Sequence, residues 1–144
     1  MRKLLAPESM AGLFGMAFVV IGVASFVPSV VDHYQQLQWC GKGSGAELLG
    51  VFQTSIVLNL LHLGFGTLGL LMARTTATAR LYLSGGGAAF LALGVYGLMI
   101  DRNGDSNVIP VDRADDWLHM GLGVAMLYAG LAAALPVLRP APSS

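Results

Sequence analysis

Four long apolar segments alternate with shorter polar ones along this chain. Each is close to the roughly 20 residues that an α-helix needs to cross the hydrocarbon core of a bilayer. The segments therefore predict four transmembrane helices, the first with Pro28 near its exit. They run over Met10–Val31, Leu48–Ala73, Leu81–Ile100 and Asp116–Leu138.

The polar stretches between them, residues 32–47, 74–80 and 101–115, are expected to be loops outside the hydrocarbon. Lysine and arginine concentrate on the cytoplasmic side of a membrane protein. The N-terminus, the middle link and the C-terminus share one side and hold more basic residues than the two long loops. We therefore expect a multi-pass protein of the cell membrane with both termini in the cytoplasm. The first side holds Arg2, Lys3, Arg74, Arg80 and Arg139, and the other holds Lys42, Arg102 and Arg113.

The composition supports a membrane location. Hydrophobic residues make up 55% of the 144 residues and charged residues 11%, whereas soluble domains carry roughly 25% charged residues. Mean hydropathy is +0.67. A net charge of zero argues against a nucleic-acid partner. We expect one membrane domain over residues 1–144, in contact with lipid, with a homo-oligomer or a membrane complex left open.

Two pairs of matching motifs indicate an internal duplication. Asn59–Gly66 and Asp116–Gly123 both read [N/D]-x-L-H-x-G-x-G and start 57 residues apart. Gly15–Val23 and Gly87–Val95 both read G-x-A-F-x-x-x-G-V and start 72 residues apart. The sequence thus predicts an all-α membrane protein built from two tandem-duplicated helical hairpins in one bundle. Repeat 1 covers about residues 10–73 and repeat 2 about 81–138, related by a pseudo-two-fold axis along the membrane normal.

This symmetry would place His62 and His119 at one depth, facing each other across the axis. Asn59 lies three residues before His62, as Asp116 does before His119, and Asp115 lies four before His119, so each set shares a helix face. A neighbouring carboxylate can fix the tautomer of an imidazole. These five residues form the candidate ligand or proton site; Asp112 is a candidate N-cap for the fourth helix.

The same motifs carry a resemblance. Asn59-Leu60-Leu61-His62 and Asp115-Asp116-Trp117-Leu118-His119 are similar to those of a bacterial family of four-helix integral membrane proteins catalogued as a domain of unknown function. The resemblance covers most of residues 10–135. It implies four helices and a membrane location, and it implies no activity.

Three functions fit these residues. The first is a structural or assembly role in the membrane, with the histidines as hydrogen-bonded clamps and the glycines allowing close helix packing. The second is a cofactor site, either haem between His62 and His119 or a divalent metal held by both histidines with Asp115 or Asp116. The third is transport of protons, ions or small solutes. We expect no catalysis, because the sequence shows no nucleophile–base pair.

Overall fold

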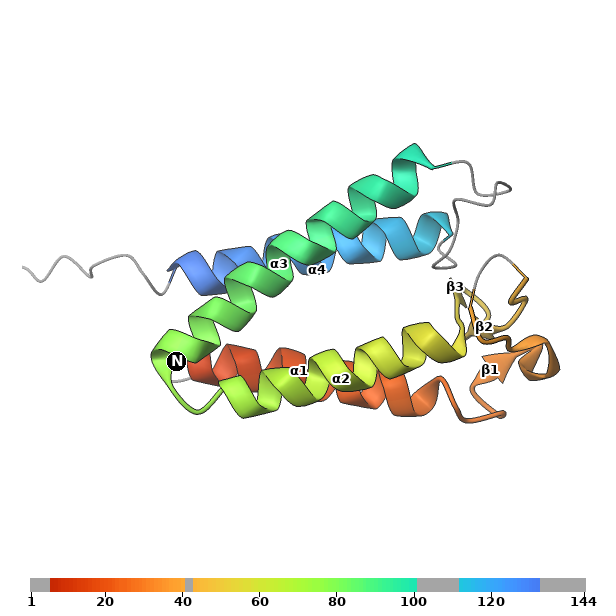
Figure 1. Ribbon diagram of the computed structural model, residues 1–144, viewed down its shortest axis with the longest axis horizontal. Helices are drawn as coiled ribbons and strands as arrows, with labels where there is room; N and C mark the ends of the chain where they lie inside the picture. Colours follow the sequence, from red (N-terminus) through yellow and green to blue (C-terminus); the bar gives the residue numbers. More distant parts are fainter. Residues whose placement is uncertain (1–5, 41–42, 101–111, 133–144) are drawn as a thin grey trace, which may run out of the picture.

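The computed structural model describes residues 6–40, 43–100 and 112–132. In this part of the chain it has four α-helices, as predicted, and a small three-stranded sheet (Figure 1). The chain is therefore an all-α protein with a minor β element. The helices are α1 (Pro7–Ala24), α2 (Ile56–Met72), α3 (Thr76–Met99) and α4 (Arg113–Ala132). The strands are β1 (Val31–Asp32), β2 (Glu47–Leu48) and β3 (Phe52–Gln53), with a 3-10 helix, η1 (Tyr34–Gln36), after β1.

The helices pack in two antiparallel pairs. α1 lies against α2, α3 lies against α4, and the two hairpins meet mainly through α1 and α3. Figure 1 shows the hairpins together at the end that carries the α2–α3 link and separating toward the sheet. The start of α1 and the end of α4 lie at the same end as that link.

The sheet corrects two expectations. The second helix begins at Ile56, not at Leu48, and the segment 32–47, which we expected to be a loop, contributes β1, η1 and part of β2. The strands pair antiparallel in the order β1-β2-β3. Leu49 and Gly50, with φ of 56° and 67°, form the left-handed turn between β2 and β3 and break the apolar run. Val31 and Leu48 of the sheet pack on Ile21 at the end of α1.

Two helix boundaries of the first hairpin follow from local chemistry. α1 begins at Pro7, a favoured first position because proline needs no hydrogen-bond partner there. It ends at Ala24, earlier than the predicted Val31, since Pro28 disfavours helical geometry in the residue before it. The Ser25 hydroxyl donates to the Ile21 carbonyl at 2.8 Å as the helix ends.

The second hairpin starts earlier than predicted at both helices. α3 begins at Thr76, not Leu81, because the Thr75 side chain accepts a hydrogen bond from the Thr78 N–H at 3.3 Å and caps the helix. α4 begins at Arg113 rather than Asp116. The predicted continuation of the fourth helix to residue 138 lies beyond the described residues.

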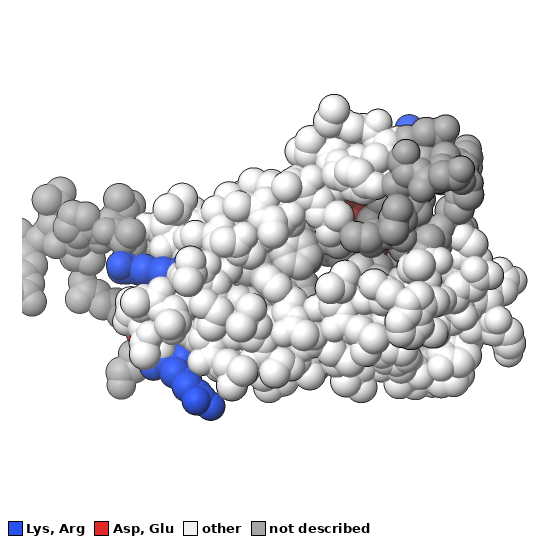
Figure 2. Space-filling model, viewed as in Figure 1, with Lys and Arg blue, Asp and Glu red and all other residues white. Residues whose placement is uncertain are grey.

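The outer faces of the helices are apolar, while small and polar residues lie inside. Leu13, Leu81 and Leu131 are each at least 60% exposed, whereas Asn59 and Asp116 are fully buried. By length and composition alone, α1 and α3 are long and apolar enough to cross a membrane, and α2 is apolar but shorter. Figure 2 shows a largely uncharged face between the two ends, with acidic atoms in the recess between the hairpins. The charged residues in the described ranges are Glu8, Asp32, Glu47, Arg74, Arg80, Asp112, Arg113, Asp115 and Asp116.

Candidate functional site

Glycine pairs bring the helices of each hairpin into backbone contact. A Cβ atom added to Gly15 would lie 2.8 Å from the carbonyl oxygen of Gly66. A Cβ added to Gly87 would lie 2.8 Å from the carbonyl oxygen of Gly123. Real Cβ atoms do not approach so closely, so α1 contacts α2, and α3 contacts α4, only because these residues lack a side chain.

A second pair of contacts repeats one level nearer the sheet. A Cβ on Gly22 would lie 3.0 Å from the carbonyl oxygen of Asn59, and a Cβ on Gly94 would lie 2.9 Å from that of Asp116. These partners are the ones that the 72- and 57-residue offsets pair. The two hairpins therefore pack by the same contacts, and this places His62 and His119 at corresponding positions.

Between the hairpins, four rings follow one another in contact. Phe18 of α1 stacks on Phe90 of α3 with ring centroids 5.0 Å apart and planes 10° from parallel. His62 stacks on Phe18 at 5.8 Å and 16°, and His119 lies on Phe90 at 5.5 Å and 30°. Phe65 meets Phe18 and Phe90 edge-on, at 5.1 and 5.2 Å. The aromatic rings hold both imidazoles in fixed orientations.

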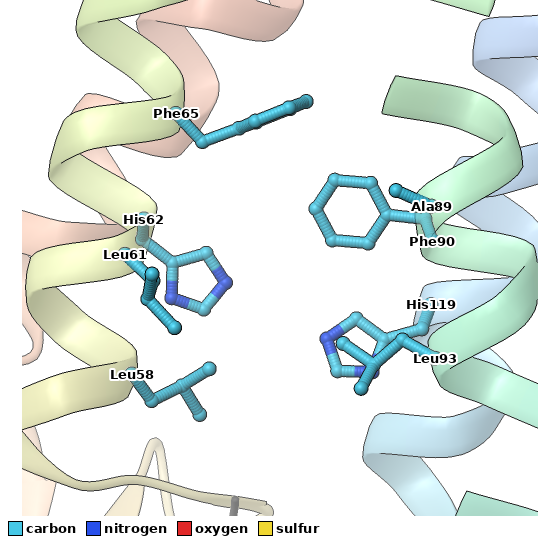
Figure 3. A pocket seen from close by; sticks show the side chains of 8 residues that line it. All are labelled: Leu58, Leu61, His62, Phe65, Ala89, Phe90, Leu93 and His119. Carbon is cyan, nitrogen blue, oxygen red and sulfur yellow. The ribbon is translucent and has the colours of Figure 1, made fainter. Parts of the chain in front are cut away.

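Both histidines line a cavity of about 240 Å³ between α2 and α3, which we call the α2–α3 cavity. Figure 3 shows the two imidazoles extending from opposite sides toward the space between the hairpins. Nδ1 of His62 and Nδ1 of His119 are both buried, and neither has a hydrogen-bond partner within the described residues. The other side chains around the cavity are apolar: Leu58, Leu61, Phe65, Ala89, Phe90 and Leu93.

A second cavity of about 250 Å³ lies beside the first, under the sheet, and we call it the capped cavity. Leu58, His62 and His119 line both cavities, so these side chains stand between them. Its remaining walls come from α1, α4 and the sheet region: Phe18, Ile21, Ser25, Leu48, Leu49, Phe52, Gln53, Thr54, Asp115, Leu118 and Leu122.

Asn59, expected in the site, instead joins helix ends. Its Nδ2 donates to the carbonyl oxygen of Ser25 at 3.1 Å, and its Oδ1 accepts from the Thr54 hydroxyl. Asp116 occupies the corresponding position of α4, with its carboxylate against Gly97 at the end of α3. Neither residue is among those that line the two cavities. Both are therefore packing residues at the level just outside the histidines.

Asp115, in the first turn of α4, both caps the helix and lines the capped cavity. Its backbone N–H donates to Oδ1 of Asp112 at 2.8 Å, and its Oδ2 accepts from the Asp112 N–H at 3.1 Å. This reciprocal pair is a capping box and confirms Asp112 as the N-cap. Burial beside the sheet, with Asp112 adding to the effect, raises the pKa of Asp115 to about 7.

The cofactor expectations can be compared with this geometry. In the described residues, no three groups of the His, Cys, Asp and Glu types come together in a way that could hold a metal ion. The proposed set of both histidines with Asp115 or Asp116 is thus not assembled there. For haem, the phenyl rings of Phe18 and Phe90 cover imidazole faces and fill the space between the hairpins where a flat macrocycle would lie.

Sequence reasoning found the histidines and missed the aromatic residues that hold them. Phe18 and Phe90 were part of the repeated G-x-A-F motif, and that repetition was the available signal. Gln53 and Thr54, which reach the capped cavity, were assigned to the second helix, and nothing in their spacing indicated a site.

Fold and site together define a small all-α chain of two helical hairpins, with one histidine from each hairpin beside shared cavities. Residues 9–132 match the domain of unknown function DUF4383, and the chain belongs to this family. The family resemblance based on the two histidine motifs is confirmed. No curated protein and no solved structure matches the chain.

Proposed function

We propose that this protein is a multi-pass membrane protein that binds a small, mainly apolar molecule in the cavities beside His62 and His119. The observation that carries the proposal is the pair of buried imidazoles with unpartnered Nδ1 atoms, set in otherwise apolar walls. A buried polar atom without a hydrogen bond costs about 1–3 kcal/mol, so it is retained where a ligand supplies the bond.

The exposed apolar surface supports placement in a membrane. Soluble monomers rarely expose contiguous apolar patches larger than a few hundred Å². Here all four helices expose large aliphatic side chains, and the helix contacts use glycine, as in membrane proteins. α1, at 18 residues, is about 27 Å long, close to the roughly 30 Å hydrocarbon thickness.

The matching contacts of the two hairpins support a tandem duplication with a pseudo-two-fold axis between Phe18 and Phe90. The axis would run along the membrane normal, with both termini and the α2–α3 link on the cytoplasmic side. Arg74 and Arg80 of that link are consistent with this orientation. The sheet and the acidic first turn of α4 would then lie on the outer side, outside the hydrocarbon.

A binding role fits the site better than a purely structural clamp or catalysis. A clamp needs hydrogen bonds from the imidazoles to neighbouring helices, and the Nδ1 atoms make none to described residues. The hydroxyls in the capped cavity are engaged elsewhere, since Ser25 donates to the Ile21 carbonyl and Thr54 to Asn59. Neither is held by an imidazole as an activated nucleophile would be.

The α2–α3 cavity has a route to the bilayer. Leu61, which is 52% exposed, and the exposed Ala89 line the cavity and also belong to the outer surface of the hairpins. A molecule dissolved in lipid could therefore enter laterally between α2 and α3 without crossing water. This favours a hydrophobic or amphipathic ligand over a hydrated ion.

Native mass spectrometry tests the proposal on protein released from lipid nanodiscs. We expect the wild-type chain to retain a bound small molecule or single lipid that the double variant His62→Leu/His119→Leu does not retain. The double variant Gly64→Ala/Gly121→Ala is the matched control, because both glycines lie in the same two helices and face open space. Identical bound masses in all three proteins would contradict the proposal.

A further inference from the structure

The two cavities correspond to each other under the offsets that relate the hairpins. Adding 57 to an α2 position, or subtracting 72 from an α3 position, converts most walls of the α2–α3 cavity into walls of the capped cavity. His62 and His119 exchange places, so both cavities share them. The corresponding pairs are Leu61 with Leu118, Phe65 with Leu122, Phe90 with Phe18, and Leu93 with Ile21.

One corresponding pair differs in chemistry. Leu58 of α2 corresponds to Asp115 of α4, so an aliphatic wall in one cavity is a carboxyl group in the other. The capped cavity is also covered by the sheet region, which brings Gln53 to its wall. The sheet follows α1, and no described strand follows α3. Two equivalent cavities have thus become one apolar cavity and one with an acidic group.

Building on the proposed binding function, we propose that the two cavities form one site for a single-chain amphiphile with a cationic head. The head lies in the capped cavity against Asp115. The chain passes the histidine pair and lies in the α2–α3 cavity. Asp115 is then the residue that determines head-group specificity.

Charge and ring chemistry favour a cation over other heads. None of the described residues that line the capped cavity is basic, while Asp115 is acidic, so an anionic head would meet repulsion without compensation. Phe18 and Phe52 line the same space, and the face of an aromatic ring attracts an ammonium group. A quaternary ammonium, which donates no hydrogen bond, can use both kinds of contact.

The dimensions favour one chain. Each cavity is slightly smaller than the roughly 300–1,000 Å³ of ordinary ligand pockets, and the two together fall within that range. Leu58, His62 and His119 separate them, so a ligand that occupies both must be narrow where it passes these side chains. A single hydrocarbon chain meets that requirement.

The test is an equilibrium binding series with three C12 probes of equal chain length. Dodecyltrimethylammonium, dodecanol and laurate are titrated into phosphatidylcholine nanodiscs that contain the full-length protein, and partitioning into empty discs is subtracted. The proteins are the wild type, Asp115→Asn, Asp112→Asn and His62→Leu/His119→Leu. Asp112→Asn is the matched control, because it removes one charge from the same capping box at a side chain that does not line either cavity.

We expect the wild type to bind the cation most tightly and laurate least. Asp115→Asn should weaken cation binding by about tenfold or more and leave dodecanol unchanged, because it removes a charge-assisted contact. Asp112→Asn should retain the preference for the cation. Equal affinity for the three probes, or equal effects of the two aspartate variants, would overturn the head-group assignment.

Failure of the assignment differs from failure of the underlying binding function. If all three probes bind equally and the histidine double variant abolishes binding, the site exists and the preference for cations is wrong. If no probe binds the wild type above empty discs, both the head-group assignment and the binding function are wrong for single-chain amphiphiles.

Discussion

Phe18 and Phe90 stack face to face with their centroids 5.0 Å apart, although 72 residues separate them in the sequence. Each comes from the same place in its hairpin, and each carries a histidine of the neighbouring helix on a ring contact. The stack is therefore the point where the two hairpins meet around the site. Aromatic pairs of this kind contribute roughly 0.5–1.5 kcal/mol beyond the area they bury.

Equivalent glycines should respond equally to substitution. Gly66→Ala and Gly123→Ala each place a Cβ within 3.0 Å of backbone atoms of the paired helix, so we expect each to destabilise the protein by about 1–3 kcal/mol. Gly64→Ala and Gly121→Ala are the controls, because no atom lies within 4 Å of the added group. Thermal unfolding in mild detergent measures all four. A large loss in one hairpin and none in the other would show that the matching contacts differ in importance.

Gly97 makes room for the carboxylate of Asp116. A Cβ at this position would lie 2.6 Å from Cγ of Asp116, so Gly97→Ala must displace a fully buried charged side chain. We expect a loss of about 1–3 kcal/mol in unfolding free energy. Gly85→Ala, in the same helix with open space around it, should be neutral or stabilising by up to about 1 kcal/mol. The contact is unimportant if both variants melt together.

The histidines should contribute little to stability. Replacing His62 or His119 by leucine removes a buried Nδ1 atom that has no partner among the described residues, so the melting temperature should stay the same or rise. Asn59→Leu is the contrasting variant, since it breaks the bonds to Ser25 and Thr54 and should cost about 1–3 kcal/mol. A histidine variant that melts as early as Asn59→Leu would favour the structural clamp.

Asp115 should make stability depend on pH. Burial raises its pKa from 3.8 to about 7, so between these values the folded protein holds a proton that the unfolded chain has released. The folded state then binds more protons than the unfolded one, and stability from this group falls as pH rises through that window. Melting curves between about pH 5 and about pH 8 should show this fall in the wild type and in Asp112→Asn, and a smaller fall in Asp115→Asn. An unchanged slope in Asp115→Asn would contradict the buried position of the carboxyl.

The helices and the pairing of the histidines were predictable because they depend on local patterns. Long apolar runs specify helices, and the offsets of 57 and 72 residues identified the positions that the glycine contacts of Gly15, Gly66, Gly87 and Gly123 make equivalent. The capping box of Asp112 and Asp115 was also visible as a spacing of three residues.

The sheet and the ring stack were not predictable from such patterns. Leu48 to Phe52 reads as apolar, and only the left-handed turn at Leu49 and Gly50, together with packing on α1, makes it two short strands. The face of each hairpin that meets the other depends on tertiary packing. The sequence could therefore place two histidines at one level, but not show that Phe18 and Phe90 separate their rings.

The central claim is that His62 and His119 line one ligand site, and nitrogen NMR of the imidazoles tests it most directly. The chain has three histidines, and His33 lies outside both cavities as an internal control. Protein labelled with ¹⁵N-histidine in nanodiscs is titrated with dodecyltrimethylammonium and, separately, with dodecanol. The account predicts that the signals of His62 and His119 shift together with one dissociation constant for at least one probe, while His33 does not move. Unshifted signals for both probes, or different dissociation constants for His62 and His119, would contradict a shared site.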